Sequence, residues 1–128
     1  MAKVRARSRP SASHRIGIKR VYEARSEADG ARILIDRLWP RGMAKASLKL
    51  DAWPRALAPS TALRKWYSHD PQRYAEFRRR YRDELAPHRD ELAALRAMIK
   101  GRSATLLTAA REPDLSHAQV LREILEEA

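Results

Sequence analysis

Three segments of the chain have the hydrophobic pattern of β-strands. Residues 16–22 alternate apolar and basic side chains, which predicts a strand with one buried face. Residues 32–36 follow an Asp-Gly turn and carry three consecutive aliphatic side chains, so we expect a strand that is buried on both faces and central in the sheet. Residues 103–109 form a third apolar run. The pattern therefore predicts strands near the beginning and the end of the chain.

Apolar residues recur at helical spacing between the second and third predicted strands. Capping residues and prolines divide this region into three helices. The residues that mark the helix ends are Ser60 or Thr61 for the first, Asp70-Pro71 for the second, and Pro87 and Gly101 for the third. The second helix carries one stripe of large apolar side chains, which predicts a core-facing surface: Tyr74, Phe77, Tyr81 and Leu85.

A last helix is predicted over residues 114–127. Ser116 followed three residues later by Gln119 matches a capping box, which puts His117 at the first helical position. Strands separated by helices indicate a sheet that is at least partly parallel, with helices packed on its faces. The predicted fold class is therefore α/β, with a small three-layer, Rossmann-like sheet.

Length and composition indicate one domain. A chain of 128 residues with 44% hydrophobic residues can bury one core. We expect residues 16–128 to form this single α/β domain and the arginine-rich residues 1–15 to form a disordered basic tail. The longest apolar runs are far shorter than the ~20 residues of a membrane-spanning helix, so no membrane partner is expected. The absence of cysteine fits a cytoplasmic protein.

The chain is strongly basic, with 27 Lys and Arg residues against 16 Asp and Glu residues and a formal net charge of +11. Five of the basic residues lie in the predicted tail, which leaves 22 basic and 16 acidic residues in the predicted domain. This charge favours an anionic partner, and nucleic acid is one candidate because Lys and Arg contacts attract phosphates of any sequence. GC-rich coding also produces an excess of arginine and alanine without any binding function. Both explanations stay open.

Candidate chemistry gathers after the second and third predicted strands, where ligands bind in open α/β sheets. The residues at these positions are Asp36, Arg37 and Arg41 after the second strand, and Arg111 and His117 after the third. Two arginines can hold a carboxylate or phosphate through forked hydrogen bonds, while Asp36 orients one of them or acts as a general base. His117, in the first turn of a helix, is suited to accepting a proton as a neutral imidazole.

Each of these residues also has a structural interpretation. An Asp-Arg ion pair often holds a loop at the end of a strand, and His117 can simply help to cap its helix. Trp39 and Trp53 can stack on a ligand ring, but a tryptophan beside a proline in a structured loop is more often a packing anchor, which we favour. The four histidines lack metal-ligand spacing and the chain has no phosphate-binding glycine loop, so we expect neither a metal nor a cofactor.

A set of motifs runs through nearly the whole predicted domain. They are Lys19-Arg20-Val21-Tyr22, the string Ile-Asp-Arg-Leu-Trp-Pro-Arg-Gly at residues 35–42, Lys45, Trp53, Pro59-Ser60, Leu63-Arg64, Phe77, Tyr81, Glu84-Leu85, Thr105-Leu106-Leu107, and His117-Ala118 with Leu121. Together they resemble the YeaO-like branch of domain of unknown function family 488, over residues 16–125. That branch usually has Asn where this chain has Ser116. Distant relatives carry cysteines at the positions of Thr108 and Ser116, so their thiol chemistry does not transfer.

The resemblance implies the same α/β fold. It also strengthens the functional interpretation of the site, because an ion pair with only a structural role would need fewer of the family's signature residues. Those signature residues are Asp36, Arg37, Arg41, Lys45, Arg64 and His117. Our leading hypothesis is a pocket for a small anionic ligand of nucleotide, phosphate or carboxylate type. In this hypothesis the ligand-binding residues are Arg37, Trp39, Arg41, Lys45 and Arg64, and the catalytic residues are Asp36 and His117. Because the family is uncharacterised, enzymatic activity stays open, and the alternatives are a nucleic-acid-binding module and a non-catalytic partner-binding domain.

Overall fold

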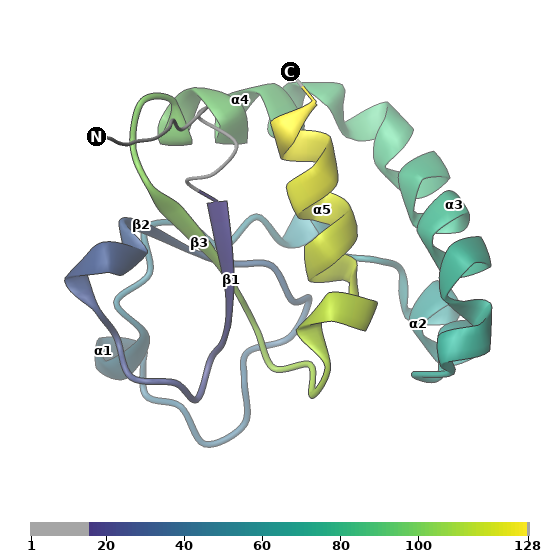
Figure 1. Cartoon of the computed structure of the whole chain (residues 1–128), viewed down its shortest axis with the longest axis horizontal. Coiled ribbons are helices and arrows are strands. Elements are labelled where there is room, and N and C mark those ends of the chain that lie inside the picture. The colour runs from purple at the N-terminus through teal and green to yellow at the C-terminus, as the bar shows by residue number, and fades with distance from the viewer. Residues whose placement is uncertain (1–15, 128) are drawn as a thin grey trace, which may run out of the picture.

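The computed structural model describes residues 16–127, and its centre is a sheet of three parallel strands (Figure 1). The strands are β1 (Ile16–Arg20), β2 (Ala31–Leu34) and β3 (Ala104–Thr108). β3 pairs with both neighbours, so that Ala104 lies opposite Ile16 on one side and Ala31 on the other. The three predicted strands and the α/β class are confirmed. The predicted tail, residues 1–15, lies outside the described residues.

The prediction that β2 is the central strand is wrong, because the order of the strands is β1-β3-β2. β2 is nevertheless buried on both faces, as predicted. Its outer edge is covered by a loop: the Leu34 amide donates to the Ala52 carbonyl at 3.0 Å, and the Asp51 amide donates to the Arg32 carbonyl at 2.8 Å. A continuous apolar run predicts that both faces of a strand are buried, but it does not predict whether the strand is central or at an edge of the sheet.

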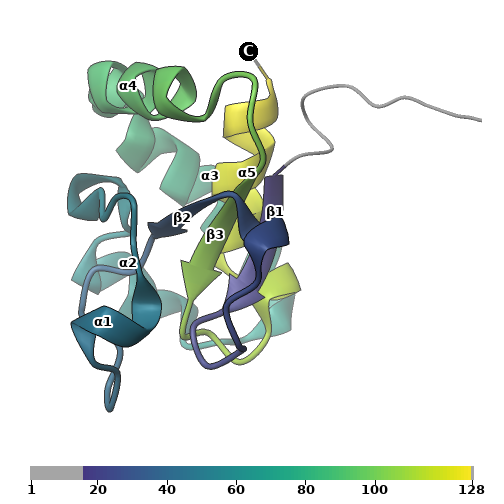
Figure 2. The same ribbon diagram turned by 90° about the vertical axis from the view of Figure 1, so that its left-hand side faces the viewer.

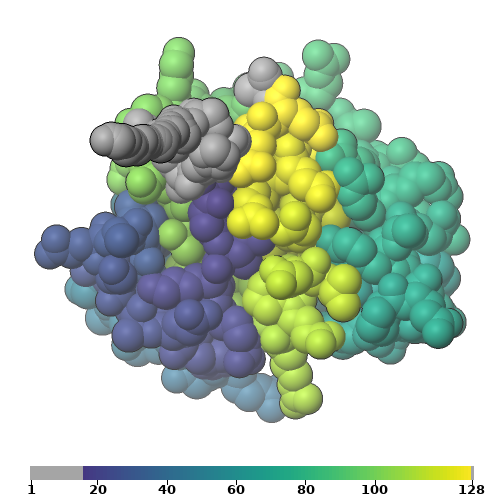
Figure 3. All heavy atoms as spheres, viewed as in Figure 1, coloured from purple at the N-terminus to yellow at the C-terminus, as the bar shows by residue number. Residues whose placement is uncertain are grey.

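In the described part of the chain, four helices cover one face of the sheet. They are α2 (Thr61–Tyr67), α3 (Tyr74–Leu85), α4 (Arg89–Ile99) and α5 (His117–Glu126). Figure 2 shows the strands side by side with α3 and α5 behind them, and Figure 3 shows α5, in yellow, between the purple start of the domain and the teal α3. The predicted stripe of α3 is confirmed, because Phe77, Tyr81 and Leu85 are buried in this core and Tyr74 packs against it.

The opposite face of the sheet is covered by loops and by the short helix α1 (Lys45–Leu48). There the side chains of Leu34 and Leu107 pack with Leu48 and with two loop tryptophans. A buried ion network lies beside them: Asp29 accepts hydrogen bonds from Lys19 and Arg32. Burial would raise the pKa of Asp29, but the hydrogen bonds of Lys19, of the Ser26 amide and of Arg32 lower it. The hydrophobic pattern did not predict this network, because the network joins Lys19 of β1 and Arg32 of β2 to Asp29, which lies in the connection between these strands.

At the start of α5, the predicted first residue of the helix is confirmed and the predicted capping box is wrong. The helix begins at His117, as expected, and the Ser116 hydroxyl accepts a hydrogen bond from the Ala118 amide at 3.1 Å. The predicted capping box does not form, because Gln119 Oε1 accepts a hydrogen bond from Arg122 on the next turn. Among the described residues, the helices are all too short or too polar to span a membrane.

Candidate functional site

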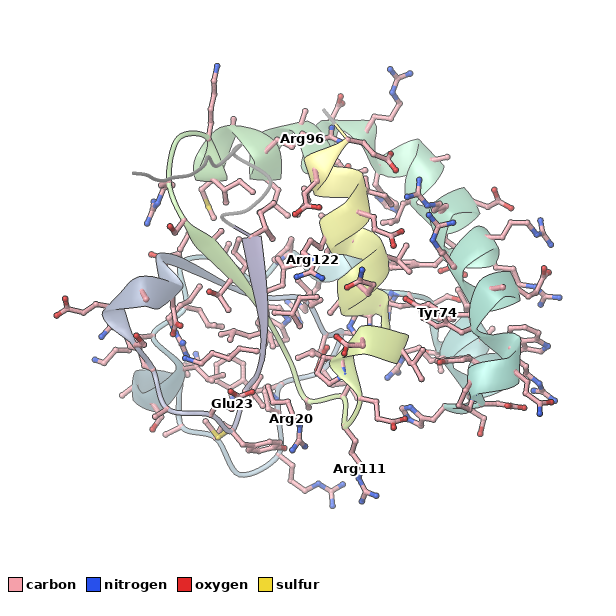
Figure 4. The ribbon with its side chains drawn as sticks, viewed as in Figure 1. Arg20, Glu23, Tyr74, Arg96, Arg111 and Arg122 are labelled. Carbon is pink, nitrogen blue, oxygen red and sulfur yellow. The ribbon has the colours of Figure 1, made fainter. Side chains whose placement is uncertain are left out.

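A cavity of about 360 Å³ lies beyond the carboxyl ends of β2 and β3. Its walls come from residues 36–41 after β2, from residues 108–110 at the end of β3, and from side chains at the start of α5 and on α2. Figure 4 labels Arg20 and Arg111, which mark this end of the sheet. The cavity therefore occupies the position where ligands bind in parallel α/β sheets.

Asp36 and His117 meet in this cavity although they are 81 residues apart in the chain. His117 Nε2 lies 2.8 Å from Asp36 Oδ1. The same oxygen accepts a hydrogen bond from the Thr108 hydroxyl at 2.8 Å, and Asp36 Oδ2 accepts one from the Ala109 amide, also at 2.8 Å. One carboxylate therefore ties the ends of β2 and β3 to the first turn of α5.

These contacts keep Asp36 charged. Burial would raise the pKa of Asp36, but the hydrogen bond and the charge of His117, with the hydrogen bonds of Ala109 and Thr108, lower it below the ordinary value of 3.8. A carboxylate only accepts hydrogen bonds, so His117 Nε2 is the donor in this contact. This arrangement suits Asp36 to holding the His117 ring in one orientation.

Three arginines line the same cavity. Arg37 Nε donates to the Pro59 carbonyl at 3.3 Å. Arg41 and Arg64 are exposed, and their guanidinium groups make no hydrogen bond or ion pair with any other residue in the range 16–127. Asp36 is the sole carboxylate among the described residues of the cavity wall. The described wall of the cavity therefore includes three arginines and a single carboxylate, which is already engaged.

The tryptophans behave mainly as packing anchors. The indole N–H of Trp39 donates to the Met43 carbonyl at 2.6 Å, and that of Trp53 donates to the Asp36 carbonyl at 2.7 Å. The two rings are in edge-to-face contact, with centroids 5.3 Å apart. Trp39 also contributes to the cavity wall, as predicted for a ligand-binding residue, whereas Lys45 starts α1 and lies outside the described wall.

The alternative of an Asp-Arg ion pair does not match the contacts of residues 16–127, in which Asp36 pairs with His117. Sequence reasoning did not assign Thr108, Tyr22 or Leu38 to the site, although all three line the cavity. Thr108 could have been found, because it ends a predicted strand. Arg111 lines a neighbouring hollow instead. Within the described range, no cluster of three or more His, Cys, Asp or Glu side chains is arranged to hold a metal ion.

Comparison of the sequence with known proteins identifies the family of the chain. A sequence-family model, described as the inactive DUF488-N3 subclade, matches residues 15–128. The uncharacterised protein YeaO of Escherichia coli is 44% identical over 110 residues, which cover 86% of this chain and 96% of YeaO. The uncharacterised protein Rv3073c of Mycobacterium tuberculosis is 43% identical over 114 residues, which cover 87% of this chain and 93% of that protein. No solved structure matches. The chain therefore belongs to the DUF488 family, within the subclade described as inactive.

Proposed function

We propose that this domain binds a small anionic ligand, of phosphate or carboxylate type, in the cavity beyond β2 and β3. The observation that carries the proposal is the charge of the cavity wall: Arg37, Arg41 and Arg64 line it, and Asp36 is its one described carboxylate. Both oxygens of Asp36 already accept hydrogen bonds. The guanidinium groups of Arg41 and Arg64 therefore remain available for a ligand within the described structure.

Electrostatics explains why such a wall attracts an anion. Like charges that line one concave surface repel each other, and a low-dielectric wall concentrates their field in the cavity. A phosphate or carboxylate relieves this repulsion and accepts forked hydrogen bonds from guanidinium groups. Arg37, which is braced by the Pro59 carbonyl, is suited to orienting the anion between the two exposed arginines.

Two observations favour binding without turnover. The hydrogen bonds of Asp36 lower its pKa and engage both of its oxygens, so Asp36 is unsuited to taking a proton from a substrate. The family model that matches the chain is described as an inactive subclade. On this proposal, Asp36 and His117 shape the cavity and hold its strands and helix together, and the arginines bind the ligand.

The surface of α3 does not favour the nucleic-acid alternative. Arg79 and Arg80 both pair with Glu76, and Arg82 pairs with Glu127. The hydrogen bonds of Arg79 and Arg80 lower the pKa of Glu76 to about 2, which keeps this carboxylate charged. The run of arginines on α3 is therefore largely neutralised by neighbouring carboxylates, as expected for an ordinary solvated helix face.

The test is calorimetric titration with inorganic phosphate, using Arg41→Ala and Arg64→Ala. A hydrogen bond to a charged group contributes about 1.5–3 kcal/mol, so each substitution is expected to raise the Kd about 10- to 100-fold. Both side chains are exposed, so we expect the free energy of unfolding to change by less than about 0.5 kcal/mol.

The matched control is Arg89→Ala, which removes an exposed arginine of α4 that lies outside the cavity wall. This variant should bind phosphate as the wild type does. An equal loss of affinity in all three variants would show that phosphate responds only to net charge and would contradict the proposal. Failure of the wild type to bind phosphate at millimolar concentration would also contradict it.

A further inference from the structure

The cavity has an apolar rim as well as cationic walls. Tyr22 is 50% exposed and Leu38 is 66% exposed, and they are the two large hydrophobic side chains that stand out as exposed among residues 16–127. Both line the cavity that contains the three arginines. A single exposed apolar side chain needs no explanation, but the convergence of both on the cavity that Arg37, Arg41 and Arg64 line does.

The ring of Tyr22 is braced in place. The Arg20 guanidinium lies 5.3 Å from the centre of this ring, and Arg20 Nε donates to the Ala110 carbonyl at 3.1 Å. The Arg20 amide also donates to the Glu23 carboxylate at 2.9 Å, which closes the turn after β1, and Figure 4 shows Arg20 and Glu23 close together there. Ala110 itself lines the cavity. The aromatic ring is thus held at the rim by the ends of β1 and β3, and little ordering is needed when a ligand contacts it.

From this geometry we infer that the ligand carries a planar ring beside its anionic group and has the size of a nucleoside monophosphate. This inference rests on the anion-binding function proposed above. The ring stacks on Tyr22 and contacts Leu38, while the anionic group reaches Arg41 and Arg64. A volume of about 360 Å³ is near the lower end of the range of roughly 300–1,000 Å³ for ligand pockets, which fits one ring and one anionic group.

The experiment compares four probes by calorimetric titration: inorganic phosphate, ribose 5-phosphate, adenosine 5′-monophosphate and adenosine. Stacking on an aromatic side chain should make the monophosphate bind about 10- to 100-fold more tightly than ribose 5-phosphate. In Tyr22→Ala this advantage should disappear while phosphate affinity stays unchanged. Tyr22→Phe, which keeps the ring, should retain the advantage. Because Tyr22 is half exposed, thermal unfolding of both variants is expected to match the wild type.

The outcomes separate this inference from the function on which it rests. Suppose that the wild type binds the monophosphate and ribose 5-phosphate equally tightly, and that it binds inorganic phosphate while Arg64→Ala does not. This result would overturn the inference that the ligand has a planar ring and would leave the anion site supported. Equal losses in Tyr22→Ala and Tyr22→Phe would also overturn stacking on Tyr22. Binding of adenosine as tightly as its monophosphate would overturn the anion site itself. Absence of binding for all four probes would overturn both.

Discussion

Replacing Asp36 with Asn tests whether one carboxylate holds the cavity together. The carboxylate accepts hydrogen bonds from Thr108, Ala109 and His117, and the amide of Asn has a single accepting oxygen. If the amide nitrogen takes the place of Oδ2, it faces the Ala109 N–H, and two donors meet. If it takes the place of Oδ1, His117 must move its proton to the other ring nitrogen to accept a hydrogen bond. Either orientation loses or rearranges at least one charge-assisted contact.

The magnitude follows from these contacts. A hydrogen bond to a charged group contributes about 1.5–3 kcal/mol, so Asp36→Asn should lower the free energy of unfolding by about 2 kcal/mol at pH 7. The hydrogen bonds of His117, Ala109 and Thr108 outweigh burial and lower the folded-state pKa of Asp36 below 3.8. The stability that the carboxylate contributes is therefore present above its unfolded-state pKa and is lost as the pH falls through its lowered folded-state pKa. The difference between wild type and variant should shrink below about pH 4.

The assay is equilibrium urea unfolding at pH 7 and at a series of lower pH values. Asp83→Asn is the matched control, because Asp83 is 73% exposed and makes a 3.6 Å contact with Arg79. That control should change the free energy of unfolding by less than about 0.5 kcal/mol. A loss below about 0.5 kcal/mol in Asp36→Asn at pH 7, or a loss that persists undiminished at pH 3, would show that the charged carboxylate does not hold the cavity together.

Two further predictions concern contacts that stabilise the fold. Gly30→Ala should cost at least about 2 kcal/mol more than Gly42→Ala. Both glycines have positive φ, but a Cβ at Gly30 would lie 2.1 Å from the Ser103 carbonyl oxygen, whereas a Cβ at Gly42 would have no atom within 4 Å. Equal melting temperatures of the two variants would contradict the steric argument. Glu84→Gln should destabilise the domain by about 1–2 kcal/mol, because the Glu84 carboxylate accepts hydrogen bonds from both the amide and the hydroxyl of Ser60. Urea unfolding measures this loss, and Ser60→Ala combined with Glu84→Gln should cost less than the sum of the single changes.

The candidate site was predictable where general rules of α/β sheets apply. The rule that ligands gather beyond the carboxyl ends of strands led to Asp36, Arg37, Arg41 and His117, which line the cavity, and to Arg111, which lines the neighbouring hollow instead. Only the family resemblance indicated Arg64. The residue pattern of a short helix does not show which of its turns faces the end of a strand.

The apolar rim was not predictable from local pattern. The local pattern makes Tyr22 the last residue of an alternating strand and Leu38 part of a loop motif. Exposure of such side chains becomes informative when they converge on one cavity, and this convergence depends on how the ends of β1 and β2 are placed relative to each other. The same resemblance that led to Arg64 also suggested Lys45, which lies outside the cavity wall at the start of α1.

Three features of the local structure follow from the amino-acid sequence: the three strands, the core-facing stripe of α3, and the start of α5 at His117. These features depend on burial patterns and capping groups within a few neighbouring residues. The central place of β3 and the contact of Asp36 with His117 across 81 residues depend on the packing of the whole domain. The order of strands and such distant contacts depend on how the packed layers bring remote segments together, and a local pattern of side chains contains no information about that arrangement.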